Sequence, residues 1–471
     1  MQASAKKKQI DILDPNANPR RLIMSLVWPM IIEEIMGILV NFVDTAMVGR
    51  LGVRATAAVA LGSPIIGVCN GIAIGLGSGF GVMMSRRIGE DRKDLALKTM
   101  QQSVYYIIVM GLLMTYLFSF VFASRLPRWM NAQPDIWDIS SDYLRYFGYS
   151  RFFITATFVS TAFLRGQGDT KNPMIGNLIA NISNCILNFL LIYPTRSAVV
   201  FGREITIWGA GQGVAGAAIA TSIANVLQTI WVMYVLFRGK DLVVPFRLGK
   251  LDGIDKDLYK FSLNLGWPNA LERFLTAMGR TICTSLLAGI SNEVLAAHNL
   301  AGTAESIIFM TVMGFGMTST TLVSQWLGAG DKDRAKLLAK ECNRLSFFVS
   351  LISTSIVFFF CPFIIGLFTK SEEVISMACL ALRIQCIIEP IEAMGMTVSG
   401  ILRGAGDVKI TAAASFLGMW GVRILGAYIM VNYMDAGLLG VWIPMALDWV
   451  VRFAILFTRY KKGKWIDAWK K

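Results

Sequence analysis

The chain has 471 residues, of which 55% are hydrophobic and only 16% are charged. About a quarter of the residues in a soluble globular domain are charged, so this composition excludes an ordinary soluble enzyme or binding domain. A helix that spans a bilayer needs about 20 apolar residues, and the chain supplies such segments almost from end to end. The composition therefore indicates a polytopic membrane protein.

The formal net charge of +14 raises the question of nucleic-acid binding, but the positions of the basic residues argue against it. They cluster at both ends of the chain, including Lys6–Lys8, and in the joints 86–98 and 332–340, whereas the connectors after Gly289 and Asn432 carry almost none. Connectors rich in Lys and Arg stay in the cytoplasm. We therefore expect both termini on the cytoplasmic side of the cell (inner or plasma) membrane, and no nucleic-acid partner.

Twelve apolar segments of membrane-spanning length follow one another along the chain. In chain order, we predict helices at residues 22–49, 57–84, 100–123, 139–163, 174–194, 209–237, 262–289, 297–326, 343–368, 375–402, 409–432 and 437–459. The longest polar joint divides them into two sets of six. The predicted organisation is a cytoplasmic tail, an N-terminal lobe, a cytoplasmic linker, a C-terminal lobe and a second cytoplasmic tail: residues 1–21, 22–237, 238–261, 262–459 and 460–471.

The two halves of the chain resemble each other at a nearly constant offset. A shift of 239 residues places Glu33 on Glu272, and a shift of 238 places Leu-Arg-Gly-Gln-Gly-Asp at 164–169 on Leu-Arg-Gly-Ala-Gly-Asp at 402–407. Because each repeat has an even number of helices, both enter the membrane from the same side, and the pseudo-twofold axis runs along the membrane normal. This predicts an all-α membrane protein with two pseudo-symmetric six-helix lobes and a cavity between them.

Each repeat carries an Arg-Gly-x-Gly-Asp motif on a predicted cytoplasmic joint. The glycines permit a tight turn, and the Arg and Asp side chains can pair or cap neighbouring helix ends. Two interpretations remain open, a hinge that moves during alternating access and a fixed turn. The charged residues of the two motifs are Arg165, Asp169, Arg403 and Asp407.

Acidic residues inside the predicted helices are the main functional candidates, because an ionisable side chain at bilayer depth costs about 2.5–3.5 kcal/mol on insertion scales. Glu33 and Asp44 point the same way from the first helix, three turns apart. Glu389 and Glu392 share a face of the tenth helix. Together with Glu272 in the seventh helix, these carboxylates are suited to bind a coupling proton or Na⁺ and to attract a cationic substrate.

Other ionisable residues at bilayer depth have a structural interpretation. Asp448 and Arg452 are spaced i, i+4 in the twelfth helix, which predicts a structural ion pair. Glu34 and Glu305 fit a structural role and a functional role equally well.

Several kinds of chemistry lack their sequence signature. The chain has no GxxxxGK[ST] phosphate loop, so ATP hydrolysis is not expected. His298 is the single histidine, and the seven cysteines show no metal-ligand spacing. A nucleophile–base set is also missing. We therefore expect no enzymatic activity and no cofactor, with Na⁺ or H⁺ as the coupling ion.

The first helix contains Val43-Asp44-Thr45-Ala-Met-Val-Gly49, and the eighth opens with Ala296-Ala-His-Asn-Leu-Ala301. With the paired Arg-Gly-x-Gly-Asp joints and the 12-helix plan, these motifs resemble the multidrug and toxic compound extrusion (MATE) family over residues 22–460. The resemblance implies a V-shaped pair of bundles that exports amphipathic, often cationic, organic compounds in exchange for Na⁺ or H⁺. It also implies that Asp44 takes part in cation coupling, and that Glu392 matches an acidic residue of the sodium-coupled bacterial branch.

Two positions depart from the family pattern. The sodium-coupled branch has its helix-7 glutamate where this chain has Thr276, one turn after Glu272, so Glu272 would substitute only in a rearranged pocket. Another prokaryotic branch has an aspartate four residues after an asparagine in helix 5, where this chain has Asn184 and Asn188. The remaining carboxylates favour a cation site in the C-terminal lobe, with Glu272 and Glu392 as candidate Na⁺ ligands. Asn184 and Asn188 are then expected to belong to the cation-coupling site or the substrate cavity.

The leading hypothesis is a cation-coupled antiporter that acts as a monomer on small organic substrates, surrounded by membrane lipids. The open alternative is a lipid-linked oligosaccharide flippase of the same broad superfamily, which would favour a strongly cationic cavity. A channel or receptor is a second alternative, and the repeat symmetry without a filter-like segment counts against it.

Overall fold

The computed structural model describes residues 11–200, 203–239, 242–249 and 253–469, so the predicted basic residues Lys6–Lys8 lie outside the described chain. The first half forms α1 (Pro19–Gly49), α2 (Val53–Gly89), α3 (Lys93–Tyr116), η1 (Leu117–Phe122), α4 (Ala123–Trp129), η2 (Pro134–Ile136), α5 (Trp137–Tyr149), α6 (Arg151–Gly166), α7 (Lys171–Leu191), β1 (Pro194–Val200), β2 (Arg203–Ala210) and α8 (Gly213–Arg238). The second half forms α9 (Lys256–Ala288), α10 (Asn292–Gly328), α11 (Lys332–Gly366), α12 (Glu372–Gly404), α13 (Val408–Phe416), η3 (Leu417–Ile424), α14 (Leu425–Asn432), α15 (Leu439–Lys461) and η4 (Lys464–Asp467).

These helices build twelve long rods in the described chain, six from each half, as the sequence predicted. Three rods are composite: α3, η1 and α4 run on without a break, as do α13, η3 and α14, and α5 is followed directly by α6. Ten rods are long and apolar enough to cross a membrane. The other two are the pair α5 and α6, which are helices of only 13 and 16 residues, and α9, which carries Glu272, Arg273 and Arg280. The protein is a multi-pass membrane protein.

A β-hairpin lies between the fifth and the sixth predicted helix, and it changes where both of them end. The sequence prediction extended the fifth helix to residue 194 and began the sixth at 209, but β1 and β2 pair as antiparallel strands over this region. Pro194 cannot donate a hydrogen bond to a continuing helix, and Ile205 and Ile207 alternate with polar residues as in a strand. The hairpin is too short to resemble a membrane segment, so the hydropathy pattern did not reveal it.

A second boundary was also wrong. Helix α11, which corresponds to the ninth predicted helix, begins at Lys332 rather than at 343. The side chain of Asp331 accepts a hydrogen bond from the backbone N–H of Arg334 and thereby caps the helix. The first turns of this helix are charged and lie beyond the apolar stretch. Capping, and not hydropathy, therefore sets where the helix starts.

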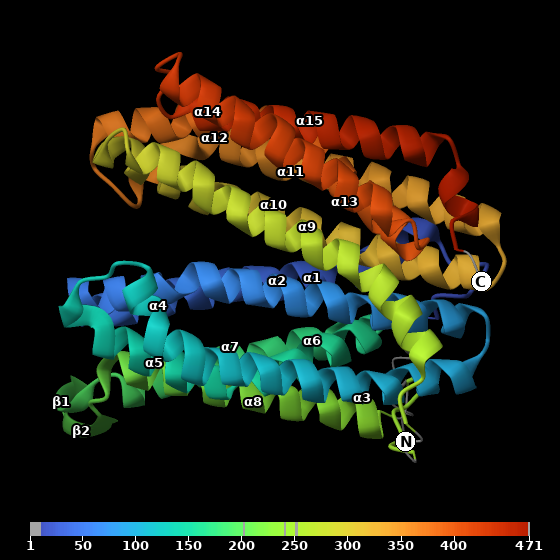
Figure 1. Cartoon of the computed structure of the whole chain (residues 1–471), viewed down its shortest axis with the longest axis horizontal. Coiled ribbons are helices and arrows are strands. Elements are labelled where there is room, and N and C mark those ends of the chain that lie inside the picture. The colour runs from blue at the N-terminus through green and yellow to red at the C-terminus, as the bar shows by residue number, and fades with distance from the viewer. Residues whose placement is uncertain (1–10, 201–202, 240–241, 250–252, 470–471) are drawn as a thin grey trace.

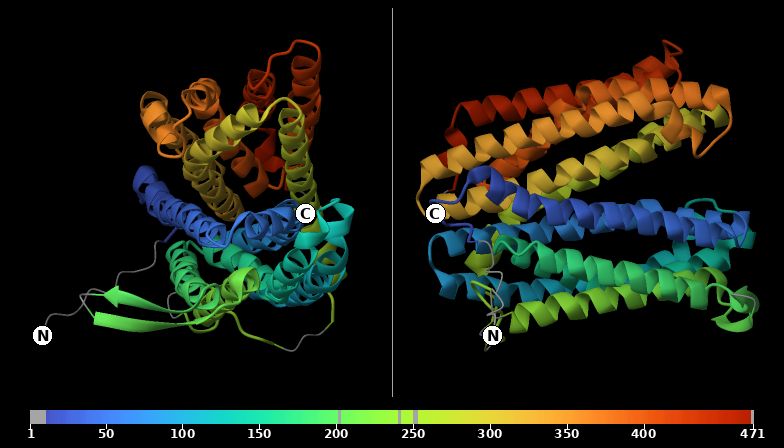
Figure 2. Two further views of the ribbon diagram at one scale, coloured as in Figure 1. Left: turned by 90° about the vertical axis from the view of Figure 1, so that its left-hand side faces the viewer. Right: turned by 180° about the vertical axis from the view of Figure 1, so that it is seen from behind.

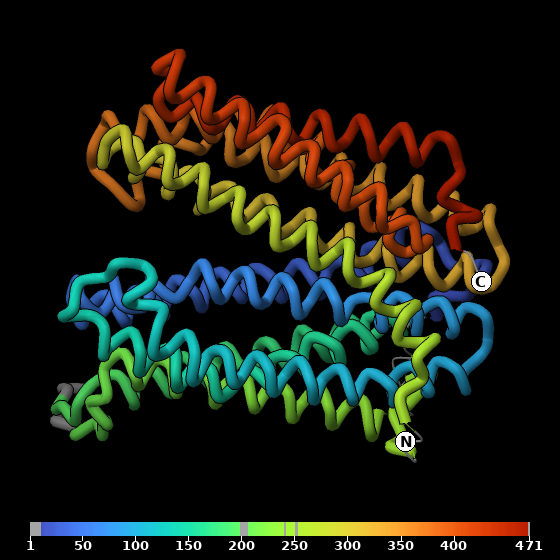
Figure 3. The backbone as a smooth tube through the Cα atoms, viewed as in Figure 1, coloured from blue at the N-terminus to red at the C-terminus, as the bar shows by residue number. Residues whose placement is uncertain are grey.

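The rods form two bundles, which we call the N-lobe (α1–α8) and the C-lobe (α9–α15). Figure 1 shows the N-lobe below and the C-lobe above, close together at one end and diverging toward the other. The end where they meet carries the turns 90–92, 167–170, 329–331 and 405–407, and we call it the terminal end because α15 and η4 finish there. The β1–β2 hairpin lies at the opposite, open end, as the rear view in Figure 2 also shows. The backbone trace in Figure 3 has the shape of a V.

Equivalent residues of the two repeats meet each other where α2 crosses α10. Ser324 Oγ donates a hydrogen bond to Ser85 Oγ at 2.8 Å, and these residues are 239 positions apart. Gly89 and Gly328 are another such pair, and a Cβ atom on Gly328 would lie 3.1 Å from the Gly89 Cα. Contacts between equivalent residues mark a twofold axis, so the pseudo-twofold axis passes between the lobes here, at the terminal end.

Small residues bring α2 of the N-lobe against α9 of the C-lobe. A Cβ atom on Gly75 would lie 2.3 Å from the Ala270 Cα, and one on Gly79 would lie 2.0 Å from the Ser262 carbonyl oxygen. Glycines four residues apart allow helix backbones to approach closely in membranes. This crossing joins the lobes and forms the floor of the space between them.

Candidate functional site

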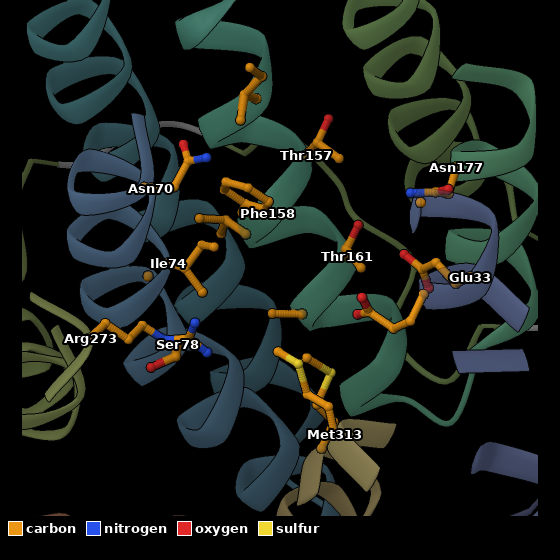
Figure 4. A pocket seen from close by; sticks show the side chains of 18 of the residues that line it. Glu33, Asn70, Ile74, Ser78, Thr157, Phe158, Thr161, Asn177, Arg273 and Met313 are labelled. Carbon is orange, nitrogen blue, oxygen red and sulfur yellow. The ribbon is translucent and has the colours of Figure 1, made fainter. Parts of the chain in front are cut away.

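A cavity of about 1050 Å³ lies between the lobes. The N-lobe lines most of it, with residues from α1, α2 and α5–α8, whereas the C-lobe contributes residues only from α9, α10, α12 and α13 near the terminal end. Figure 4 shows side chains from both lobes pointing into this space. Drug-sized ligands occupy pockets of about 300–1,000 Å³, so the predicted central cavity is present and is large enough for an organic molecule.

Asp44 lies on the N-lobe wall of the cavity and is held by amides rather than by a second acid. Asn188 donates a hydrogen bond from Nδ2 to Asp44 Oδ1, and the same amide contacts Asn184 Oδ1 at 3.1 Å. Asn184 in turn donates to the Thr221 hydroxyl at 3.1 Å. Asn184 and Asn188 are buried, whereas Asp44 is half-buried and lines the cavity. The helix-5 asparagines therefore fix the orientation of a carboxylate that the cavity can reach.

Glu33 and Glu34 also line the cavity, nearer the terminal end. Glu33 accepts a hydrogen bond from Arg165 Nη2 at 2.7 Å, which forms an ion pair with both side chains largely buried. Figure 4 shows Glu33 reaching into the pocket from α1. Because Glu33 is already neutralised by Arg165, it is less available to a cation than Asp44 is.

The C-lobe holds its own acidic cluster, built from Glu305 on α10 and from Glu389 and Glu392 on α12. One carboxylate oxygen of each lies within 4.8 Å of the others. Gln385 donates from Nε2 to Glu392 at 2.7 Å and to Glu389 at 3.5 Å. Glu389 and Glu392 are fully buried, and the Oε1 atom of each lacks a hydrogen-bond partner in the described chain. Unpaired buried carboxylate oxygens are costly, so this cluster suits a bound cation.

The structure places Glu272 elsewhere. Glu272 is not part of the group formed by Glu305, Glu389 and Glu392, and the sharing of an ion between Glu272 and Glu392 stays a prediction. Its Oε2 atom is buried without a hydrogen-bond partner among described residues. Helix spacing alone could not reveal which neighbour completes the Glu389–Glu392 pair. The partner is Glu305, for which a structural role and a functional role were equally compatible with the sequence.

The predicted pair of Asp448 and Arg452 is confirmed and has a third member. Arg452 donates through Nε to Asp448 Oδ1 and through Nη2 to Asp448 Oδ2, and Arg423 Nε also lies 2.8 Å from Oδ2. All three side chains are buried. Arg423 lies on the π-helix η3. The triad therefore places a net positive charge inside the C-lobe, and Arg423 is also close enough to Glu305 to interact with it electrostatically.

The two Arg-Gly-x-Gly-Asp motifs form turns, but their Arg and Asp side chains do not pair with each other. Gly168 and Gly406 have φ values of +86° and +82°, a conformation that glycine adopts readily. Asp169 accepts from the backbone N–H of Asn172 at 3.0 Å and caps α7. Asp407 instead pairs with Arg459 of α15 at 2.6 Å.

Arg403 points back toward the lobe interface. Its Nη1 donates to Asn269 Oδ1 at 3.1 Å, and Asn269 donates to Ser78 Oγ at 2.8 Å. This chain of contacts joins α12, α9 and α2, and thus links the two lobes at the cavity floor. The sequence predicts Arg403 only as part of a turn. Neither Asn269 nor Ser78 carried a signal that could have identified it.

Arg273 is a cavity residue for which the sequence predicted no role. It lies on α9 and lines the cavity, and Figure 4 shows its side chain extending into the pocket. The cost of an arginine at bilayer depth was the signal that could have identified it.

The cavity and its two acidic sites belong to a chain that matches a known family twice. The MatE family model matches residues 29–190 and 268–429. Both ends of the second match follow the first by 239 residues, which is the offset of the internal repeat. The repeat therefore coincides with the family's structural unit.

Curated relatives and solved structures agree with this match. A probable multidrug resistance protein NorM from Thermotoga maritima is 28% identical over 452 residues, covering 95% of this chain and 93% of the relative. An uncharacterized transporter, YisQ, from Bacillus subtilis is 24% identical over 447 residues, covering 94% and 95%. A structure described as the outward-facing conformation of a multidrug resistance MATE family transporter has a TM-score of 0.86 at 23% identity, covering 99% of this chain and 100% of that one.

Proposed function

The chain belongs to the multidrug and toxic compound extrusion (MATE) family of transporters, and we propose that it is a secondary antiporter that exports amphipathic cationic organic compounds in exchange for Na⁺ or H⁺. The observation that carries the proposal is the combination of a large interlobe cavity with a separate cluster of three carboxylates in the C-lobe. An antiporter needs a place for the substrate and a place for the ion. These two features supply them in different lobes.

Asp44 is the proposed attachment point for the cationic part of the substrate. It faces the cavity, and its described partner is the neutral amide of Asn188. A carboxylate oriented by neutral donors keeps its full negative charge for a ligand, and charge-assisted contacts are stronger than neutral ones. The apolar lining of the same cavity would hold the hydrophobic part.

The ion site is proposed at Glu305, Glu389 and Glu392. Three carboxylates this close cannot all be ionised without a compensating cation or bound protons. Hard cations bind oxygen ligands, and the two unpartnered Oε1 atoms of Glu389 and Glu392 are such ligands. We favour Na⁺ over H⁺ at this site because the cluster gathers three oxygen donors in one place.

The orientation of the protein is proposed from the distribution of positive charge. The turns at the terminal end are flanked by Arg86, Arg87, Arg92 and Lys93 and by Lys332 and Arg334, so the positive-inside rule places this end in the cytoplasm of a cell whose inner or plasma membrane holds the protein. The cavity floor is then on the cytoplasmic side, and the lobes diverge toward the outside. In an alternating-access cycle, a single chain would break the contacts at the α2–α9 crossing to open inward. The Arg-Gly-x-Gly-Asp turns are the proposed hinges.

Purified protein in proteoliposomes tests this function. Rhodamine 123, an amphipathic cation, should move against its own gradient when an opposing Na⁺ or proton gradient is imposed, and ATP should have no effect. Dissipating each ion gradient separately with a selective ionophore identifies the coupling ion. Transport of rhodamine 123 at the same rate with and without both gradients would overturn the antiport proposal.

A further inference from the structure

The chain that follows α15 crosses from one lobe to the other. Gly463, with a φ of +66°, turns the backbone at the end of α15, and η4 comes directly after it. Figure 1 shows this part of the chain running from the C-lobe toward the N-lobe at the terminal end. We call residues 462–469 the tail segment. Its last residue, Trp469, packs against a hydrophobic cluster built mainly from α2, α3, α6 and α8 of the N-lobe.

The first part of the tail segment is fixed to the C-lobe. Trp465 is 1% exposed and packs in a cluster that includes residues of α10, α11, α12 and α15. Its Nε1 donates a hydrogen bond to the carbonyl oxygen of Tyr460 at 3.0 Å. Asp467 forms an ion pair with Lys332, at the start of α11, at 2.7 Å. The tail segment therefore moves with the C-lobe whenever the lobes move relative to each other.

Trp469 lies between the two lobes. On the N-lobe side, the guanidinium carbon of Arg86 in α2 lies 4.4 Å from the centre of the indole ring, which is a cation–π contact. On the C-lobe side, a Cβ atom on Gly406 would lie 2.7 Å from Trp469 Cε3, so the ring covers the turn of the second Arg-Gly-x-Gly-Asp motif. Phe261, near the start of α9, meets the ring edge to face with the ring centroids 5.0 Å apart.

The internal repeat shows what the tail segment adds. Arg86 corresponds to Gln325 at the offset of 239 residues. Gln325 Nε2 donates a hydrogen bond to the carbonyl oxygen of Gly166 at 2.6 Å, so the C-lobe contacts the N-lobe motif directly. Arg86 instead meets the indole ring of Trp469, and that ring covers the C-lobe motif at Gly406. Trp469 thus completes the second of two pseudo-symmetric contacts that join the lobes at the terminal end.

The linker between the lobes provides a contrast. It follows α8 as the tail segment follows α15, and it also covers a motif turn, since Gln167 Oε1 accepts a hydrogen bond from the backbone N–H of Val244 at 2.8 Å. Val244 and Phe246, however, are buried in the hydrophobic cluster of their own N-lobe. The linker contacts therefore stabilise one lobe, whereas the contacts of Trp469 stabilise the approach of two.

We propose that Trp469 is a latch that holds the terminal end closed. It docks on Arg86 when the lobes meet at this end and leaves Arg86 when they separate, because Trp469 moves with the C-lobe and Arg86 with the N-lobe. The side chain of Arg86 is only 14% exposed, and a cation–π contact is stronger when it is desolvated. This inference rests on the proposed function because alternating access is the motion that the latch would control.

The distance between spin labels on the two lobes measures the latch. Arg92→Cys in the α2–α3 turn and Lys409→Cys in α13 place one label on each lobe at exposed positions of the terminal end. Six native cysteines are buried, and Cys185 is replaced by serine. Pulsed electron paramagnetic resonance on the purified full chain in detergent, without substrate or ion gradient, gives the distribution of distances. A closed terminal end gives the shorter distance, and a separated one gives the longer distance.

The labelled protein with an intact tail segment should show mainly the shorter distance. Trp469→Ala should raise the ratio of the longer to the shorter distance by about fivefold or more, the size expected for loss of a desolvated cation–π contact. Arg86→Gln should also raise the ratio. The double variant should have less effect than the two single effects combined, because both substitutions remove the same contact. Trp469→Phe keeps an aromatic ring over Arg86 and should restore most of the closed population.

Two controls separate the latch from other losses. Glu90→Gln removes the ion pair of Arg86 within its own helix, at 3.3 Å, and Trp129→Ala removes an exposed indole at the open end. Neither should change the ratio. An unchanged ratio in Trp469→Ala and Arg86→Gln, fully additive effects of the two, or an equal effect of Glu90→Gln would overturn the latch. Thermal unfolding shows which variants are folded, and Arg86→Gln decides alone if Trp469→Ala is not.

The latch and the antiport can fail separately. The distances are measured without a gradient, so a latch that is overturned leaves export of rhodamine 123 to be decided in proteoliposomes. Conversely, distances that shift as expected in a protein without gradient-driven export would retain the latch and reject the antiport.

Discussion

The N-lobe and the C-lobe share the same arrangement of helices, but their acidic side chains are arranged differently. In the N-lobe, Asp44 is a single carboxylate that Asn188 orients toward an open cavity. In the C-lobe, Glu305, Glu389 and Glu392 are gathered with their oxygens within 4.8 Å of one another. By the offset of 239 residues, Asp44 corresponds to Cys283. The acidic sites therefore did not arise from one ancestral site that was kept in both halves.

The two arrangements of carboxylates suit two different kinds of ligand. A lone carboxylate with neutral neighbours attracts an organic cation and can release it when the cavity changes shape. A cluster of carboxylates requires a small cation or protons whenever it is buried. Under the proposed function, the repeated scaffold would supply the symmetric motion, and the unequal side chains would give each lobe its own ligand. The predictions below test this division of labour.

The largest expected effect comes from removing the C-lobe cluster. The double variant Glu389→Gln and Glu392→Gln leaves amides of the same shape but no charge to hold an ion. We expect gradient-driven rhodamine 123 efflux to fall to the level of empty liposomes, while binding of the dye persists. We also expect Na⁺ to stop raising the thermal unfolding midpoint, because a ligand stabilises only the state that binds it. A double variant that retains full coupling would place the ion elsewhere.

The complementary change in the N-lobe should affect the substrate more than the ion. Asp44→Asn removes the charge and keeps the size, and it should weaken rhodamine 123 binding by about 10- to 100-fold, since hydrogen bonds to charged groups contribute about 1.5–3 kcal/mol. Fluorescence anisotropy measures the change. The Na⁺-dependent shift in the unfolding midpoint should survive in this variant. Loss of the Na⁺ response with unchanged dye binding would reverse the roles assigned to the two lobes.

A matched pair of glycines compares the two lobe-to-lobe crossings. Gly75 and Gly314 occupy equivalent positions of the repeat. An added Cβ atom would overlap the Ala270 backbone at 2.3 Å in the first case, but would meet Met30 at an ordinary 3.5 Å in the second. Overpacking costs about 1–3 kcal/mol. Gly75→Ala should therefore lower the unfolding midpoint and expose a cysteine introduced at Ser78 to a maleimide reagent, and Gly314→Ala should do neither. Equal behaviour of the two variants would show that the crossings are equally tight.

The smallest expected effect concerns an ion pair between the lobes at the terminal end. Lys98 of α3 donates to Asp255, which caps α9, at 2.5 Å. The Lys98 hydrogen bond, with help from the Leu258 N–H, holds the pKa of Asp255 below its ordinary value of 3.8. A lowered pKa in the folded state means that the contribution to stability is present above the ordinary value and is lost as the pH falls through the lowered one.

Because Lys98 is about half exposed, solvent screening keeps the contribution of this pair below about 1 kcal/mol. The variant Lys98→Met should lower the unfolding midpoint slightly at neutral pH, and the difference from wild type should disappear in strong acid. The reference is Arg20→Met, which removes the contact with Glu341 that joins α1 to α11 on the other side of the molecule. A wild-type advantage over Lys98→Met that grows in acid would contradict the assignment.

Local features of the chain were sufficient to predict the architecture. Apolar length identified the rods because a bilayer leaves a helix few alternatives, and the Glu33–Glu272 match and the paired Arg-Gly-x-Gly-Asp motifs revealed the duplication. The Asp448–Arg452 pair was also predicted, since an i, i+4 contact is set within one helix. Each of these inferences needs only the sequence spacing and the geometry of a helix.

The tertiary structure decided which side chains meet. Glu305 and Glu392 come from different helices, as do Glu33 and Arg165, and the spacing along one helix cannot set the rotation of another. The same reason hid Arg273, whose place depends on the absence of a side chain at Gly71 on a different lobe. The sequence determined two similar bundles with acid inside them. Only the tertiary packing determined that the N-lobe acid faces a cavity, that the C-lobe acids face one another, and that Arg273 reaches the cavity between the lobes.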